Sequence, residues 1–230
     1  MGNMGRILLS SFIPASCAFL VGCGTVGQPI VRDTTRTFST VVVDAGHGGK
    51  DNGAFRRYGG AEKQATLDVA TRLAQKLRES NFKTIMTRSS DVFVPLDERA
   101  AISNRQNNAI FVSIHFNDSS RRGIRGFETY YHSAVARDLA YRIQGELLTI
   151  PGAANRGVKT ANFRVLRKAA YPAVLVECGF LSNRKEGAGA RNADYRDELA
   201  DRIAQAIVGT RHGPMGAAAT GFSTAQSSRH

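Results

Sequence analysis

The feature that most constrains this chain is an alternation between short apolar segments and longer segments with helical periodicity. Apolar and β-branched residues predict strands over 39–45, 82–87, 109–116, 126–131, 163–166 and 173–177. Apolar residues spaced three and four apart predict helices over 62–80, 95–107, 133–148 and 195–208. Strands that are apolar on both faces and alternate with helices form mostly parallel sheets covered by helices. We therefore expect one α/β domain over residues 39–210, with a mostly parallel twisted sheet of about six strands flanked by helices.

The two ends of the chain differ in composition from this domain. Residues 1–22 contain one charged residue, Arg6, before an apolar stretch too short to span a bilayer comfortably, which predicts an export signal. The segment ends in Leu20-Val21-Gly22-Cys23, which resembles the bacterial lipobox and implies a diacylated Cys23 at the mature N-terminus. An ordinary secretory signal with a chance cysteine is the alternative. We expect residues 23–38 to be a flexible tether and 211–230 a disordered tail.

This interpretation of the N-terminus also predicts a location. A lipid on Cys23 would hold the domain at the periplasmic face of the cell envelope. Gly24 stands where an aspartate retains many lipoproteins at the inner membrane, so the outer membrane is favoured. Cys17 would leave with the signal, and Cys178 would then have no disulfide partner in the mature chain.

The formal net charge of +12 favours polyanionic surroundings such as nucleic acid, anionic lipid or wall polymer. The basic residues are scattered singly, however, with only short pairs such as Arg56-Arg57 and Arg121-Arg122. The sequence contains no dense basic run, no zinc-finger spacing and no basic segment with aromatic stacking residues. We therefore expect no nucleic-acid partner.

Four polar residues, His47, Glu62, His115 and Glu177, stand where a predicted strand ends or a predicted helix begins. In a parallel sheet these positions share one rim, where open α/β sheets bind ligands. Three of them could hold zinc with an open fourth position, and the fourth could serve as a base. The first three also have ordinary interpretations: a loop histidine, a carboxylate favoured by the helix dipole, and a core histidine. Glu177 is harder to explain in this way, because burying an unpaired carboxylate in an apolar strand costs several kcal/mol.

Two other kinds of site fit the sequence poorly. The glycine-rich loop over 46–53 lacks both the Gly-Lys-Ser/Thr of a phosphate-binding loop and the dinucleotide spacing. No serine occupies a Gly-x-Ser-x-Gly elbow, so a serine triad is unsupported.

Four separated motifs occur in order along the predicted domain: Val43-Asp44-Ala45-Gly46-His47-Gly48-Gly49, Glu62-Lys63, Ser113-Ile114-His115-Phe116-Asn117, and Pro172-Ala173-Val174-Leu175-Val176-Glu177. Arg156-Gly157-Val158-Lys159 lies between the last two. Together they resemble the motifs of the bacterial zinc-dependent N-acetylmuramoyl-L-alanine amidases. The resemblance covers residues 40–209, which is nearly the whole predicted domain.

The resemblance implies one zinc ion held by His47, Glu62 and His115, with Glu177 as the catalytic carboxylate. It also implies hydrolysis of the amide bond between N-acetylmuramic acid and L-alanine in peptidoglycan, in wall remodelling or daughter-cell separation. We further expect Asn117 and Arg156 to contact the substrate. Arg156 could pair with a stem-peptide carboxylate, and a solvated loop arginine is the alternative.

Several departures from the family pattern qualify this picture. Phe116 and Asp118 are bulkier or more acidic than the usual neighbours of the His-x-Asn motif, and Cys178 replaces another small residue. Some family members carry a long inserted helix that covers the zinc and awaits an activator. The segment after Tyr131 is too short for such a helix, so we expect an open site, and a protein activator stays an open question.

Two other functions stay open. One is a wall-binding protein on an inactive amidase fold, which the loss of a zinc ligand or of Glu177 would favour, and none is lost. The other is a different zinc amide hydrolase, such as a peptidase or sugar deacetylase, which would show another order of motifs.

Overall fold

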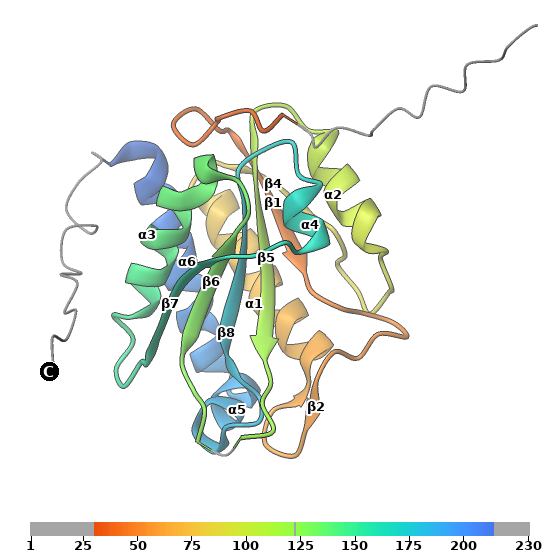
Figure 1. Cartoon of the computed structure of the whole chain (residues 1–230), viewed down its shortest axis with the longest axis vertical. Coiled ribbons are helices and arrows are strands. Elements are labelled where there is room, and N and C mark those ends of the chain that lie inside the picture. Colours follow the sequence, from red (N-terminus) through yellow and green to blue (C-terminus); the bar gives the residue numbers. More distant parts are fainter. Residues whose placement is uncertain (1–29, 122, 214–230) are drawn as a thin grey trace, which may run out of the picture.

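The computed structural model describes residues 30–121 and 123–213 (Figure 1). At its centre lies a six-stranded sheet in the order β4-β1-β5-β8-β6-β7. The strands are β1 (Thr40–Ala45), β4 (Lys83–Met86), β5 (Ala109–Asn117), β6 (Phe127–Tyr131), β7 (Asn155–Thr160) and β8 (Ala173–Phe180). Neighbours from β4 to β8 run parallel, whereas β6 is antiparallel to β8 and parallel to β7. The prediction of a mostly parallel sheet of about six strands is confirmed.

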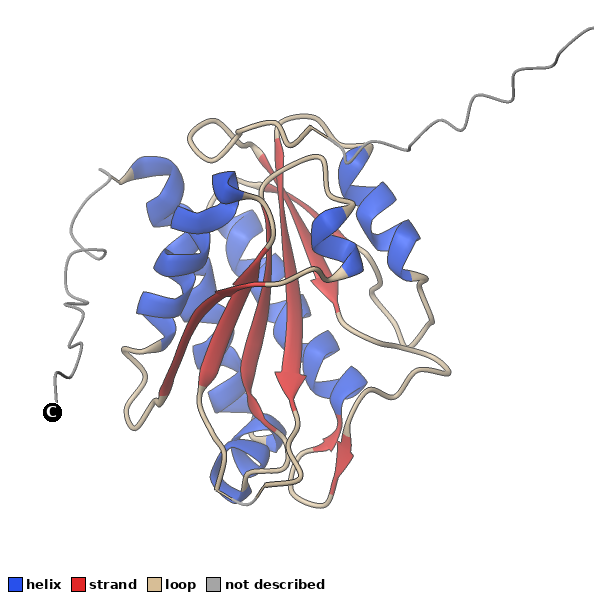
Figure 2. Cartoon of the chain, viewed as in Figure 1, coloured by secondary structure: helices blue, strands red, loops and turns tan. Residues whose placement is uncertain are grey.

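Helices cover the two faces of this sheet unequally (Figure 2). Helices α1 (Glu62–Glu79), α3 (Arg137–Leu147) and α6 (Ala193–His212) pack on one face and form the large core. Helices α2 (Leu96–Asn104) and α4 (Arg164–Arg167) pack on the other face and form the small core. The remaining elements are the hairpin of β2 (Phe55–Arg56) and β3 (Gly60–Ala61), the single turn η1 (Ala134–Ala136) and helix α5 (Arg184–Arg191).

The side chains of β5 show how the sheet positions a site. Successive side chains of a strand point to opposite faces. Ile110, Val112 and Ile114 enter the large core, and Phe111 enters the small core. Ser113 and then His115 follow Phe111 on its face, beyond the end of the small core. The face under α2 and α4 therefore changes from apolar to polar towards the carboxyl ends of the parallel strands.

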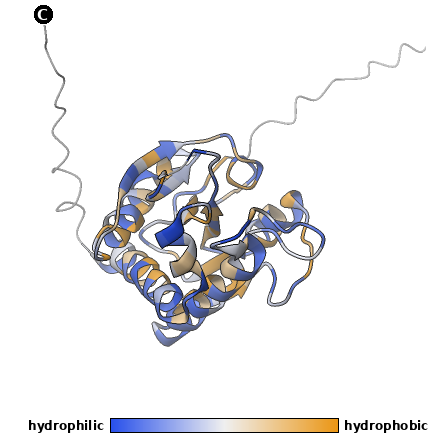
Figure 3. Ribbon diagram, turned by 90° about the horizontal axis from the view of Figure 1, so that it is seen from below, coloured by the Kyte–Doolittle hydropathy of each residue, from blue (hydrophilic) through white to orange (hydrophobic). Residues whose placement is uncertain are grey.

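Figure 3 looks at the molecule from below and shows hydrophobic and hydrophilic residues alternating along the peripheral helices. This pattern is expected of helices that bury one face and expose the other. Within residues 30–121 and 123–213, every helix falls short of the length and apolar character that crossing a membrane requires.

One predicted strand is wrong. Residues 163–166 were expected to be extended, but only Phe163 is, with φ −65° and ψ 138° at the N-cap of α4. The carbonyl oxygen of Phe163 accepts hydrogen bonds from the backbone N–H groups of Leu166 and Arg167. Strand β7 was not predicted, because its sequence is polar and contains Gly157. It is an edge strand paired only with β6, where a polar sequence is tolerated.

The ends of the described chain pack against the domain. Within the region predicted as a tether, the backbone N–H of Arg32 donates to the carbonyl oxygen of Ala170, and the Thr34 hydroxyl donates to that of Ala109. Phe38 is fully buried and its ring stacks 5.3 Å from that of Phe82. Helix α6 continues to His212, two residues beyond the predicted domain boundary. The predicted signal, Cys23 and most of the predicted tail lie outside the described residues.

Candidate metal centre and catalytic site

The imidazole of His47 is presented by a glycine-rich loop directly after β1. His47 has a positive φ of 60°, which costs a non-glycine residue about 1–3 kcal/mol. Gly46 lets His115 lie against this loop, because a Cβ at Gly46 would overlap the His115 ring. A Cβ at Gly53 would lie 2.7 Å from His47 Cδ2 and 2.5 Å from Glu62 Oε2. The glycines therefore permit the close approach of three polar side chains.

These three side chains converge on one carboxylate oxygen. His47 Nε2 lies 2.9 Å from Glu62 Oε1, and His115 Nδ1 lies 3.0 Å from the same oxygen. The two imidazole rings meet edge to face with their centroids 4.9 Å apart. Asp51 Oδ2 lies 2.9 Å from His47 Nδ1. This contact fixes which nitrogen of His47 faces Glu62, as carboxylates commonly do for metal-binding histidines.

The donor set fits a zinc ion. Among the described residues, His47, Glu62 and His115 form the one group of three whose ligand atoms all lie within 4.8 Å of one another. Zinc takes imidazole nitrogens and carboxylate oxygens, and tetrahedral coordination places them roughly 3.3 Å apart. The structure thus brings together the three residues that the sequence predicted as ligands.

The electrostatics of the cluster favour a cation. Burial disfavours the charged form of Glu62, but hydrogen bonds with His115 and His47 outweigh burial and hold the pKa of Glu62 well below its usual range. Burial lowers the pKa of His47, while Glu62 and Asp51 raise it by more. The cluster therefore stabilises a carboxylate with positive charge beside it, which is the charge distribution that a divalent cation supplies.

Glu177 lies beside this cluster on β8. Its Cα is paired with that of His115 on β5 and with that of Glu128 on β6, so the three side chains share one face of the sheet. Glu177 Oε2 is buried and has no hydrogen-bond partner among the described residues. Burial, with the charges of Glu62 and Glu128 and against that of His115, raises the pKa of Glu177 to about 7. Such a carboxyl group can exchange a proton near neutral pH.

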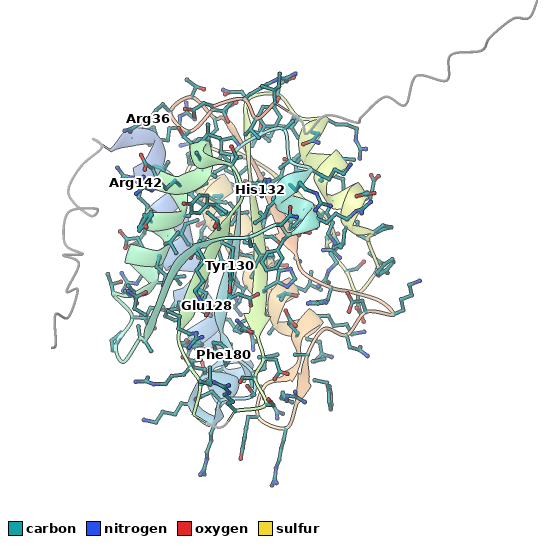
Figure 4. The ribbon with its side chains drawn as sticks, in the orientation of Figure 1. Arg36, Glu128, Tyr130, His132, Arg142 and Phe180 are labelled. Atoms are coloured by element: carbon teal, nitrogen blue, oxygen red, sulfur yellow. The ribbon has the colours of Figure 1, made fainter. Side chains whose placement is uncertain are left out.

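Glu128, which sequence reasoning missed, organises the polar side chains beside the candidate metal centre (Figure 4). Glu128 is 2% exposed, and four side chains donate hydrogen bonds to its carboxylate. They are Asn117 Nδ2 at 2.9 Å, Tyr130 Oη at 2.6 Å, Arg156 Nε at 2.6 Å and Lys159 Nζ at 2.7 Å. The two predicted substrate contacts, Asn117 and Arg156, therefore meet at one buried carboxylate. The period of two along β6 could have indicated Glu128, since it predicts this side chain on the polar face of the sheet.

Arg156 keeps part of its guanidinium group available. Its Nε is bonded to Glu128, and its Cζ lies 5.1 Å from the centre of the Phe180 ring. No described residue accepts a hydrogen bond from its two terminal nitrogens. A guanidinium group that is fixed at Nε and free at both ends can hold a carboxylate through two parallel hydrogen bonds.

A family model described as N-acetylmuramoyl-L-alanine amidase matches residues 41–208. The chain belongs to this family.

Curated and solved relatives of this amidase-family chain agree with the match. It is 36% identical over 205 residues to the N-acetylmuramoyl-L-alanine amidase LytC of Bacillus subtilis, covering 87% of this chain but 40% of LytC. Its fold matches N-acetylmuramoyl-L-alanine amidase AmiC2 of Nostoc punctiforme with a TM-score of 0.71 and 37% identity, covering 74% of this chain and 94% of that one. It also matches the CwlD amidase from Clostridioides difficile, solved in complex with the GerS lipoprotein, with a TM-score of 0.71 and 30% identity, covering 75% and 98% of the two chains.

In this member of the amidase family, two buried arginines brace the His47 loop. Arg88 Nη2 donates to the carbonyl oxygen of Gly46 at 2.7 Å, and Arg99 Nη2 donates to that of His47 at 2.6 Å. Arg99 Nη1 also lies 2.7 Å from Asp44 Oδ1, and both of these residues are almost fully buried. Sequence reasoning missed both arginines. Asp44 within an apolar strand was a signal that a buried cation must lie nearby, but it could not show which one.

The departures from the amidase family pattern have plain structural roles. The Phe116 side chain enters the large core, while its backbone N–H donates to Glu62 Oε1 at 3.1 Å. Asp118 forms an ion pair with Arg56. Cys178 is fully buried, and burial raises the pKa of its thiol, so the group stays protonated and shielded from solvent.

Proposed function

We propose that this chain is a zinc-dependent N-acetylmuramoyl-L-alanine amidase that hydrolyses the amide bond between N-acetylmuramic acid and L-alanine in peptidoglycan. The observation that carries the proposal is the convergence of His47, Glu62 and His115 beside Glu177, at the polar end of a sheet face. Membership of the amidase family supports the reaction class. The chain spans 40% of the length of LytC. Its biological role, in wall remodelling or daughter-cell separation, is therefore proposed here and not carried over from that relative.

Different residues of the candidate site would carry out different parts of the reaction. His47, Glu62 and His115 would hold one zinc ion, which when bound polarises the scissile carbonyl and acidifies water. Glu177 accepts a proton from the water that attacks this carbonyl and then donates it to the departing nitrogen of L-alanine. A pKa of about 7 suits both transfers, because the group can take up and release a proton at neutral pH.

The substrate contacts follow from the Glu128 network. We assign the free terminal nitrogens of Arg156 to a carboxylate of the stem peptide. Glu128 fixes Nε of this guanidinium group and the Phe180 ring packs against it, so the two terminal nitrogens are held in place for a ligand. Asn117 is held by the same carboxylate and lies two residues beyond His115 on β5. It would contact the substrate beside the scissile bond.

We also propose that Cys23 carries lipid and that the domain acts at the periplasmic face of the envelope, with the outer membrane favoured by Gly24. The support is the sequence of the N-terminus, since Cys23 lies outside the described residues. A protein activator belongs to the proposal because the related CwlD amidase was solved with the GerS lipoprotein.

Digestion of purified peptidoglycan by residues 30–213 tests the proposed activity. This range contains the whole described fold, and the solved AmiC2 chain, of which this chain covers 94%, folds as a domain of similar extent. We expect mass spectrometry to detect free stem peptides that begin with L-alanine. The products should disappear on chelation, return with added zinc, and be absent for Glu177→Gln, which should still bind one zinc ion per chain.

A surface variant, Glu98→Gln, is the matched control, because Glu98 is exposed and, among the described residues, its carboxylate pairs only with Arg105. It should digest peptidoglycan like the unaltered domain. Intact wall despite bound zinc would replace the proposal with a wall-binding function. Cleavage within the stem peptide, or release of acetate from the sugars, would replace it with another zinc amide hydrolase.

A further inference from the structure

A basic groove lies next to the candidate site, on the far side of the β2–β3 hairpin. It consists of two neighbouring cavities of about 560 and 400 Å³ that share Arg56 and Arg57 in their walls. The first is also lined by Asp68, Arg191 and Arg196. The second runs along the loop after β5 and includes Arg121 and Ser182. The groove begins close to the candidate metal centre, since Ala61 in its wall directly precedes Glu62.

Tight glycine packing builds this groove. A Cβ at Gly187 of α5 would lie 2.5 Å from the carbonyl oxygen of Leu181 and 2.9 Å from Tyr58 Cβ. A Cβ at Gly59 would lie 2.6 Å from Leu181 Cδ2. The hairpin therefore sits directly on α5, so Arg57 and Arg191 are held on neighbouring walls by packed backbone.

The charge of the groove is not neutralised by the protein. Its walls contain five arginines and one acidic residue, Asp68. Asp68 is already paired with Arg72 and Arg196, and Arg56 is paired with Asp118. The three remaining arginines, Arg57, Arg121 and Arg191, are exposed and have no acidic partner among the described residues. Figure 4 shows long nitrogen-tipped side chains extending from this end of the molecule.

We propose that this groove binds carboxylates of a neighbouring stem peptide while the candidate catalytic site holds the peptide to be cut. Guanidinium groups match carboxylates in geometry, and several of them on one surface hold a polyanion by summed attraction. The inference rests on the proposed function, because peptidoglycan repeats its peptide carboxylates along the strand and so presents a second one next to the candidate catalytic site. An anionic lipid surface fits less well, since residues 30–38 pack against Ala109 and Ala170, at the opposite end of the strands from the groove.

Binding to purified peptidoglycan freed of attached polymers tests the proposal. All proteins carry Glu177→Gln, so that the wall stays intact during the measurement. We expect Arg57→Glu/Arg191→Glu to lower the fraction of residues 30–213 that pellets with the wall at least fivefold at low salt. Arg57→Gln/Arg191→Gln should give an intermediate loss. The matched control, Arg78→Glu/Arg137→Glu, changes the net charge equally at exposed positions away from the groove and should bind like the parent.

Two further arms identify the ligand. Amidation of the wall carboxylates should remove the difference between the groove variant and the parent. Equal losses for the groove and control variants would overturn the proposal, because net charge alone would then explain binding. Parent protein that binds polyphosphate or vesicles of anionic lipid more tightly than the wall would overturn it as well. Peptide release by the unaltered domain is measured separately, so failure of the groove and failure of the amidase activity are distinguishable.

Discussion

The His47 loop shows how single residues fix the geometry of the candidate metal centre. His47 has a strained backbone, and its carbonyl oxygen and that of Gly46 accept hydrogen bonds from Arg99 and Arg88. Arg99 is in turn anchored by Asp44, whose carboxylate also accepts hydrogen bonds from neighbouring hydroxyl groups. The orientation of the imidazole therefore depends on an ion pair that is almost fully buried.

Removing both members of this pair should cost less than the sum of removing each alone. Arg99→Met leaves the Asp44 carboxylate buried without its counter-charge, and we expect the free energy of unfolding to fall by about 3–5 kcal/mol. Asp44→Asn with Arg99→Met should lose less than the sum of the single changes, because no isolated charge remains. Urea denaturation of the four proteins measures this coupling. Simple additivity would show that the two residues act independently.

Glu128 should make the domain sensitive to acid. Burial raises its pKa, but hydrogen bonds from Lys159, Tyr130 and Arg156 lower it by more. The folded state then binds fewer protons than the unfolded state, so stability rises with pH across this window. The contribution of Glu128 is fully present above its ordinary pKa near 4.5 and is lost as the pH falls towards the lowered value.

The stability gap between the unaltered domain and Glu128→Gln measures this contribution. We expect the unaltered domain to be more stable at pH 7 and the gap to shrink steadily below pH 5, as followed by urea denaturation at each pH. Glu98→Gln is the control, because Glu98 is on the surface. A gap that is constant from pH 7 to pH 3 would contradict the lowered pKa.

At the scale of elements, two helical glycines differ in the space available for a side chain. A Cβ at Gly187 of α5 would press on the backbone of Leu181, whereas a Cβ at Gly145 of α3 would meet nothing within 4 Å. We expect Gly187→Ala to lower the free energy of unfolding by about 1–3 kcal/mol through overpacking. Gly145→Ala should raise it by roughly 0.5–1 kcal/mol, since alanine favours the helix. Thermal unfolding of both variants separates the two effects, and equal shifts of one sign would refute the packing argument.

The sequence predicted the elements that are strongly periodic and missed those that are not. The buried strands β1, β5 and β8 were foreseen because apolar residues fill them. Strand β7 and helix α5 were missed, since the first is a polar edge strand and the second contains two glycines. The strand predicted over residues 163–166 was wrong because an apolar pattern this short fits either a strand or one helical turn.

The candidate site, like the fold, could be predicted only in part from the sequence. His47, His115 and Glu177 end strands, and Glu62 begins a helix, so their convergence followed from topology. The residues that support them could not be found in this way. Arg99 meets Asp44 across 55 positions of sequence, and no local pattern encodes such a pair.

For the whole molecule, the described chain begins at one end of the sheet and the candidate site lies at the other. The described chain enters beside the starts of β5 and β8, where Thr34 and Arg32 bond to Ala109 and Ala170. His115 and Glu177 lie towards the other ends of the same strands.

The unequal covering of the two sheet faces has a consequence for how the sequence can vary. Along β5, Ile110, Val112 and Ile114 belong to the large core, whereas Ser113 and His115 lie on the polar half of the other face, Ser113 buried against Asp44. Adjacent positions in β5 are therefore constrained by different requirements, one by folding and the next by catalysis. Substitutions on one face would be lost through poor folding, and those on the other through poor turnover by well-folded protein. The unit of evolutionary constraint in this strand is a face and its partner layer, not a stretch of consecutive residues.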